Sequence, residues 1–301
     1  MTQKTKMSSY SVIIAVFLLI TVMYTGCSTD STVTSTTPGL NLNITGLEDL
    51  GATAIYEGWI IVNGAPLSTG TFTVDASGNL SKTIFDSNYA FVDSATTFVL
   101  TIEPVPDPST APSETHILAG DFTGNSAPLT VGHGAALGNN FATIVGKYIL
   151  ATPTNGAGNN ENSGLWFLQL IGGNPAVGLT LPTLPAGWIY EGWAVINGSP
   201  VTTGTFLRVD TVDNFAPYSG TMPGPPFPGE DFLVNAPSGQ TFPTNLAGMV
   251  AVISIEPFPD NSASPFTLKP LVKAIPVNAI DHTTYDLDQN LGSFPTGTAT
   301  R

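Results

Sequence analysis

The chain has 301 residues, of which 42% are hydrophobic and only 10% charged, and it carries a formal net charge of −14. A surface this acidic repels the phosphate backbone, which excludes nucleic-acid binding, and a chain this apolar is not disordered as a whole. Its 31 glycines and 25 prolines are typical of short strands separated by turns rather than of long helices.

The N-terminal segment has the three parts of a bacterial export signal. Lys4 and Lys6 give a basic start, residues 12–23 form an apolar run, and small residues lead into Cys27. The run is shorter than the roughly 20 apolar residues that cross a membrane, so it predicts the core of a signal peptide. A cysteine directly after such a signal is the residue that carries the lipid of bacterial lipoproteins. Because Tyr24 replaces the usual Leu-like residue, a plain secretory signal and a single helical anchor stay as alternatives.

We therefore predict a signal peptide over 1–26 and a lipid-anchored tether over 27–43, with lipidation of Cys27. The tether is rich in Ser and Thr, as a flexible spacer would be. Cys27 is the only cysteine, so the folded part holds neither a disulfide nor a cysteine-based zinc or redox site. The expected location is extracytoplasmic, on the plasma or outer membrane, with the leaflet left open.

An internal repeat dominates the rest of the chain. Residues 55–72 read IYEGWIIVNGAPLSTGTF, and residues 189–206 read IYEGWAVINGSPVTTGTF. A second pair of motifs follows, TIEPVPD at 101–107 and SIEPFPD at 254–260. The second copy is longer between its two motifs, where a Pro/Gly-rich segment predicts an inserted loop. A period this long indicates two copies of one domain and not a solenoid.

Each copy predicts β structure. The repeated Tyr-Glu-Gly-Trp runs are aromatic and β-branched and end in Asn-Gly, a strong signal for a hairpin, and the later strands stop at a proline. Two further strands, at 146–153 and 163–170, are assigned to the second copy. The sequence predicts an all-β fold with two tandem Ig-like β-sandwich domains, over 44–141 and 142–301.

The order of these motifs, followed by a Pro/Ser loop and a short strand (116–120 and 269–273), resembles the extracytoplasmic domain of anti-sigma-K factors of the RskA type. The resemblance covers both copies, and it implies an Ig-like sandwich and an envelope setting. Anti-sigma factors also need a cytoplasmic segment and often carry a His–Cys–Cys zinc cluster, and we expect neither here. We therefore expect no direct binding of a sigma factor, since a shared fold does not transfer function.

Each copy also repeats two carboxylates, Glu57 with Glu103 and Glu191 with Glu256. Such a pair can serve as acid and base in a glycosidase. Alternatively, each carboxylate accepts hydrogen bonds from nearby turns, because an unpaired carboxylate inside an apolar strand is costly. Duplication favours the structural role, since an active site often decays in one copy. We predict no catalytic residue, and we interpret as structural the family motif formed by Tyr56, Glu57, Gly58, Trp59, Gly70, Glu103, Pro104, Tyr190, Glu191, Gly192, Trp193, Gly204, Glu256 and Pro257.

Metal and cofactor sites are not predicted. The histidines, at 116, 133 and 282, lack the spacing of a metal site, and residues 75–79 fit a hairpin turn better than a calcium loop. The Gly/Asn-rich stretch 156–164 lacks the lysine of a phosphate loop. Trp59 and Trp193 are repeated and are predicted to be in the core, whereas Trp166 and Trp188 are not repeated and are candidates for exposed contacts.

These observations predict a non-enzymatic envelope lipoprotein that acts as a binding, spacing or regulatory module. Its expected partners are the membrane, through the lipid on Cys27, and an unidentified envelope protein or glycan. The main alternative is a carbohydrate-binding or carbohydrate-active protein. A third hypothesis is an accessory of envelope-stress signalling that acts on a separate anti-sigma factor.

Overall fold

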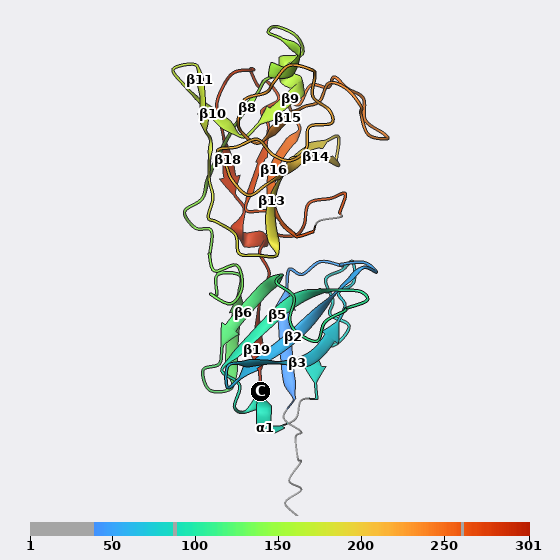
Figure 1. Ribbon diagram of the computed structural model, residues 1–301, viewed down its shortest axis with the longest axis vertical. Coiled ribbons are helices and arrows are strands. Elements are labelled where there is room, and N and C mark those ends of the chain that lie inside the picture. The colour runs from blue at the N-terminus through green and yellow to red at the C-terminus, as the bar shows by residue number, and fades with distance from the viewer. Residues whose placement is uncertain (1–38, 87–88, 260–261) are drawn as a thin grey trace, which may run out of the picture. The chain divides into compact units, whose positions relative to one another are not determined.

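The computed structural model describes residues 39–86, 89–259 and 262–301, and their regular secondary structure is almost entirely β (Figure 1). The predicted all-β fold with two β-rich modules is confirmed. No helix in the described ranges is long and apolar enough to cross a membrane. The predicted signal peptide, Cys27 and most of the predicted tether lie outside the described residues.

The first module is an eight-stranded antiparallel sheet in the order β3-β2-β5-β6-β7-β19-β1-β4. One short helix, α1 (Tyr89–Val92), belongs to the same part of the chain. The strands are β1 (Leu40–Thr45), β2 (Ala54–Val62), β3 (Ala65–Phe72), β4 (Ile84–Phe85), β5 (Thr97–Pro104), β6 (His116–Asp121), β7 (Ser126–Thr130) and β19 (Thr296–Thr300).

The second module is a nine-stranded sheet in the order β14-β13-β16-β17-β18-β8-β9-β15, with β12 also paired to β8, beside a separate β10–β11 hairpin. The strands are β8 (Val145–Leu150), β9 (Gly164–Trp166), β10 (Leu168–Ile171), β11 (Asn174–Val177), β12 (Leu179–Thr180), β13 (Trp188–Ile196), β14 (Ser199–Phe206), β15 (Gly229–Asp231), β16 (Val250–Pro257), β17 (Leu271–Ala274) and β18 (Tyr285–Gln289). Three short 3₁₀ turns complete it, η1 (Pro153–Asn155), η2 (Glu161–Ser163) and η3 (Leu291–Ser293).

The repeated motifs occupy equivalent places in the two sheets. The run β3-β2-β5-β6-β7 corresponds to β14-β13-β16-β17-β18 in both order and direction. The hairpin register shifts by one residue between Gly58 and Trp59, and again between Gly192 and Trp193. Both copies therefore carry a β-bulge at the same motif position, with the extra residue, Thr69 or Thr203, on the second strand of the hairpin.

The C-terminal strand returns to the first module. β19 pairs with β1 on one side and with β7 on the other, so the first sheet takes in residues 40–43, expected in the tether, and 296–300, expected in the second domain. Burial strictly alternates along β1, and Ala299 of β19 is fully buried. The local sequence of neither segment predicts this pairing, because the two strands are separated by almost the whole chain.

Arg301 fixes the end of this returning strand. Its guanidinium donates hydrogen bonds to the carbonyl oxygens of Val92 and Ala95, both at 2.7 Å, and to that of Gly124 at 3.0 Å. It also lies over the ring of Phe122, 4.4 Å from the centroid. These contacts satisfy carbonyl groups of the first module with a residue that comes after the second in sequence.

We predict that Gly297→Ala destabilises the first module. A Cβ at this position would lie 2.5 Å from the carbonyl oxygen of Asn43 and 2.9 Å from Cα of Ile44, so β19 cannot keep its distance from β1. Urea unfolding should show a loss of about 1–3 kcal/mol. The matched control is Gly292→Ala, whose Cβ would meet nothing within 4 Å; equal losses in the two variants would contradict the close approach of β19.

Candidate functional site

The repeated carboxylates of the first module lie at the centre of a buried hydrogen-bond chain. The indole N–H of Trp59 donates to the hydroxyl of Thr101 at 2.9 Å, and that hydroxyl donates to the carboxylate of Glu103. The backbone N–H of Ser113 donates to both oxygens of Glu103, at 2.9 and 3.2 Å. Glu57, on the neighbouring strand, accepts a hydrogen bond from the hydroxyl of Ser68, and burial raises its pKa.

The second module repeats this arrangement with two changes of hydroxyl residue, Thr101 to Ser254 and Ser68 to Thr202. Trp193 donates to Ser254 at 2.8 Å, and Ser254 donates to Glu256. The backbone N–H of Phe266 donates to both oxygens of Glu256, at 2.9 and 3.1 Å. Glu191 accepts a hydrogen bond from Thr202. All four repeated carboxylates are buried and engaged by donors of the fold, so in this arrangement they brace the sheet.

The remaining motif residues shape the backbone around these carboxylates. A Cβ at Gly58 would lie 2.6 Å from the hydroxyl of Thr69, which donates to the carbonyl oxygen of Gly58 itself. Gly70 and Gly204, with φ of 111° and 117°, adopt a conformation that favours glycine. Pro104 and Pro257 end β5 and β16.

The two repeated tyrosines anchor neighbouring segments. Tyr56 donates to the carbonyl oxygen of Glu48 at 3.0 Å, and Tyr190 donates to that of Pro182 at 2.8 Å. Each tyrosine also stacks on the phenylalanine that ends the partner strand of its hairpin. The motif thus joins strand, hairpin and incoming loop in both copies.

The expectation of exposed Trp166 and Trp188 is wrong. Both side chains are buried, with 4% and 2% relative exposure. Trp166 donates its indole N–H to Asp231 at 2.7 Å, and Trp188 packs against Phe266. Trp166 belongs to a small separate cluster of the second module, whereas Trp188 belongs to the main core.

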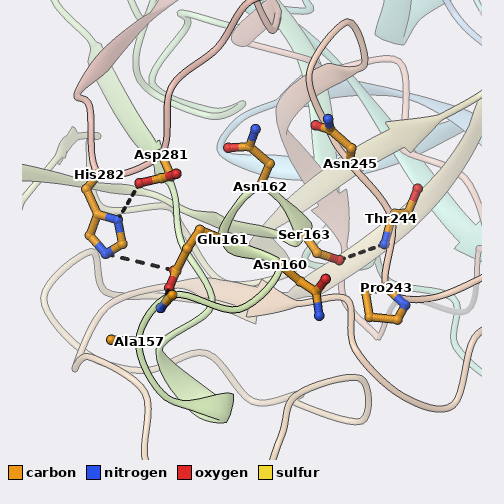
Figure 2. Close-up of a pocket in the computed structure, with 11 residues that line it drawn as sticks. Ala157, Asn160, Glu161, Asn162, Ser163, Pro243, Thr244, Asn245, Asp281 and His282 are labelled. Carbon is orange, nitrogen blue, oxygen red and sulfur yellow. Dashed lines mark hydrogen bonds and ion pairs between the residues drawn. The ribbon is translucent and has the colours of Figure 1, made fainter.

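A polar pocket of about 640 Å³ lies in the second module, and its lining comes from three loops. Figure 2 shows Asp281 and His282 on one side, Thr244 and Asn245 on the other, and the η2 turn between them. The lining residues are Ala157, Gly158, Asn160, Glu161, Asn162, Ser163, Pro243, Thr244, Asn245, Asp281 and His282. None is Lys or Arg, so the lining offers carboxylates, amides, hydroxyls and one imidazole.

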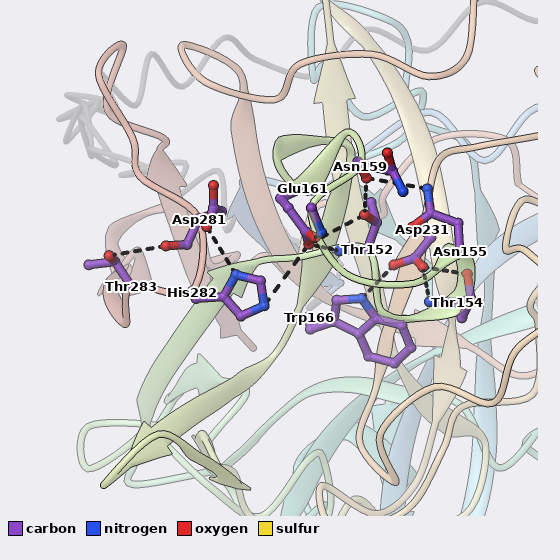
Figure 3. Close-up of polar contacts among 11 residues, drawn as sticks. Thr152, Thr154, Asn155, Asn159, Glu161, Trp166, Asp231, Asp281, His282 and Thr283 are labelled. Carbon is purple, nitrogen blue, oxygen red and sulfur yellow. Dashed lines mark hydrogen bonds and ion pairs between the residues drawn. The ribbon is translucent and has the colours of Figure 1, made fainter.

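Glu161 is held in place by its own loop. Its carboxylate accepts hydrogen bonds from the backbone N–H of Gly158 at 2.5 Å and from that of Thr152 at 3.1 Å. The imidazole of His282 lies 4.0 Å from the same carboxylate through Nε2, and its Nδ1 lies 3.0 Å from Asp281 (Figure 3). This wall of the pocket therefore consists of the fixed Glu161 carboxylate and the His282 imidazole, which lies between Glu161 and Asp281.

Directly under this loop are buried acids. Asp231 accepts hydrogen bonds from the backbone N–H of Thr154 at 2.8 Å and from Trp166 (Figure 3), and burial raises its pKa. Burial also raises the pKa of Glu230 to about 8 and that of Asp213 to about 7, and the charge of Asp213 adds to the shift at Glu230. Of these three acids, Asp231 contacts the loop through Thr154, and none of them lines the pocket.

Sequence reasoning missed the pocket. The stretch 156–164 lacks the lysine of a phosphate loop and His282 lacks the spacing of a metal ligand, so neither indicates a binding site by itself. One signal was available: the lining segments are those that the repeat does not duplicate. The β6–β7 connection spans only 122–125, for example, whereas the equivalent β17–β18 connection spans 275–284 and holds Asp281 and His282. Within the described ranges no group of three His, Cys, Asp or Glu side chains is placed to hold a metal ion.

We predict that Thr101→Val destabilises the first module by about 1–3 kcal/mol, because it leaves the Trp59 indole and the Glu103 carboxylate without their shared hydroxyl in a buried site. Thr97→Val is the control, since Thr97 lies on the same strand and makes an exposed hydrogen bond to Asp121. Denaturant unfolding measures both, and similar small losses would contradict the role of the buried chain.

A further prediction concerns pH. A carboxyl whose pKa is higher in the folded than in the unfolded state stabilises fully below its unfolded pKa, and this contribution is lost as pH rises through the folded value. For Glu230 the window runs from about 4.5 to about 8, and for Asp213 it ends near 7. The second module should therefore lose stability between pH 5 and pH 9.

Glu230→Gln, which mimics the protonated side chain, should remove part of that loss, up to about 4 kcal/mol. The exposed Glu114→Gln controls for net charge. Thermal unfolding at both pH values measures the change. An unaltered pH dependence in Glu230→Gln would contradict the assignment.

No family model, no curated protein and no solved structure matches this chain. The resemblance to RskA-type anti-sigma-K factors therefore stays a prediction that rests on the sequence motifs alone.

Proposed function

We propose that this protein is a lipid-anchored component of a bacterial envelope, and that it binds a ligand through its second module without chemically changing it. The contrast between the two copies carries the proposal. In both copies the repeated carboxylates are buried and held by donors of the fold. The polar pocket, in contrast, is built from loops of the second module that have no repeat.

The pocket contains Ser163, His282 and Asp281, the residue types of a nucleophilic triad, but their geometry supports binding. The hydroxyl of Ser163 donates to the carbonyl oxygen of Phe232 at 2.7 Å and accepts from the backbone N–H of Thr244 at 2.8 Å. His282 approaches Glu161 and Asp281, and its hydrogen bonds do not include Ser163. Since Ser163 is buried and ties two loops together, it serves to shape the pocket.

The first module then acts as a spacer and support. Its repeated network has the same construction as that of the second module, but its loops are shorter where the pocket forms in the second. The acidic composition keeps an exported domain soluble and away from anionic surfaces. Together with the lipid on Cys27, the first module would hold the pocket at a distance from the membrane.

We predict that Cys27→Ala moves the protein from the membrane fraction to the soluble extracytoplasmic fraction. The reason is that no thiol remains to carry the lipid. Ser28→Ala is the matched control and should stay in the membrane fraction. Mass spectrometry of the wild-type N-terminus should show the lipid on Cys27. Retention of Cys27→Ala in the membrane fraction would overturn the lipid anchor and favour a helical one. Crosslinking in living cells tests the binding role separately, by capturing the partner.

A further inference from the structure

The groups in the polar pocket indicate what it can recognise. Asn160, Asn162 and Asn245 each carry an amide that donates and accepts, while Glu161 and Asp281 accept when ionised. Lys and Arg are absent from the lining, and so an anionic ligand meets two carboxylates with no compensating cation. A volume of about 640 Å³ is within the usual range for small-molecule sites, roughly 300–1,000 Å³.

One acceptor in this lining has no use within the fold. The amide oxygen of Asn162 is buried and has no hydrogen-bond partner among the described residues, whereas its amide nitrogen donates to the carbonyl oxygen of Ala279 at 3.4 Å. A buried acceptor left without a donor is costly. Because this oxygen is closed to solvent, a ligand donor would remove that cost only where the Asn162 side chain turns toward the pocket.

Backbone conformation also marks the pocket. Asn160 and His282 adopt positive φ, at 56° and 52°. Asparagine enters this region readily, but histidine does so less often, and residues held there concentrate at ligand sites. The backbone N–H of His282 donates to the carbonyl oxygen of Leu150 at 2.9 Å, which holds the residue in this conformation and its imidazole beside Glu161.

From these observations we infer that the pocket is a saccharide subsite for a neutral or amino-bearing sugar ring. This inference rests on the binding role proposed above. Sugar hydroxyls both donate and accept, so they can pair with the amides as well as with the carboxylates. A basic peptide offers only donors from its side-chain cations, so the amide N–H groups of the asparagines could pair with its backbone carbonyl groups alone. Pro243 and Ala157 give the lining its apolar surface.

The test uses the full chain, extracted from membranes in a detergent without a sugar headgroup, and isothermal titration with three oligosaccharides. The probes are an N-acetylglucosamine oligomer, its deacetylated glucosamine form and a polygalacturonate fragment. We expect binding of the neutral or the amino oligomer and none of the anionic one. Preferred binding of polygalacturonate, or no binding of any of the three, would overturn the inference.

Two substitutions locate the site. Asn162→Leu removes the buried acceptor and should weaken binding about tenfold or more, as expected for the loss of one buried hydrogen bond. His282→Gly removes the imidazole, and glycine accepts the positive φ, so the loop is kept while affinity falls. Thermal unfolding checks that both variants are folded. Unchanged affinity in both folded variants would overturn this pocket as the site.

A third substitution separates the two kinds of sugar. Asp281→Asn keeps the shape but removes a charge, so it should weaken the deacetylated oligomer strongly and the neutral oligomer little. The matched control is Asp121→Asn, because Asp121 pairs with His133 at 3.3 Å on the first module and should leave both affinities unchanged. Displacement of the sugar by an oligolysine peptide with tighter binding would assign the pocket to a basic partner and overturn the saccharide. The Cys27→Ala fractionation does not depend on any of these titrations, so a negative result for the saccharide would not count against the lipid anchor.

Discussion

Burying carboxylates inside β-strands is the constraint on which both modules depend. Four glutamates lie within or at the ends of apolar strands, where an ionised group without partners would be strongly destabilising. For Glu103 and Glu256 the donors are a hydroxyl two residues earlier, itself held by an indole from the next strand, and a backbone N–H from the following loop. Glu57 and Glu191 each accept from a hydroxyl of the partner strand in their hairpin. Removal of any one donor leaves a buried polar group without its hydrogen bond, and the loss of stability then exceeds that of a single isolated bond.

This constraint explains why the motif survives duplication nearly unchanged. The hydroxyl can be supplied by Thr101 or by Ser254, since both donate to the glutamate in the same way. The glycine of the bulge cannot change as easily, because a Cβ at Gly192 would lie 2.5 Å from the ring of Phe167. Residues outside the network are free to diverge. The loops of the second module have diverged, and they carry the pocket.

The parts predicted from the sequence are those whose signals are local. Alternating apolar residues, Asn-Gly turns and strand-ending prolines indicate β-strands, and repetition of whole motifs indicates two equivalent modules. The pairing of β1 with β19 has no local signal, because it joins residues 41–45 to 296–300. The pocket was equally hidden, since Glu161, Thr244 and His282 come together only through three separate loops. The burial of Trp166 likewise depends on Asp231, a residue distant in sequence.

The pocket loop links recognition to the buried acids beneath it. At its tip, Glu161 accepts from Thr152 and Gly158. At its base, Thr154 donates to Asp231 and also accepts from the backbone N–H of Gly220 at 2.7 Å. The segment 152–161 is thus held by two carboxylates, that of Glu161, which lines the pocket, and that of Asp231, which is buried. Burial raises the pKa of Asp231, and the hydrogen bonds that it accepts from Thr154 and Trp166 offset only part of that rise. The shape of the pocket wall consequently depends on the same device, a buried carboxylate saturated with donors, that stabilises the repeated motif.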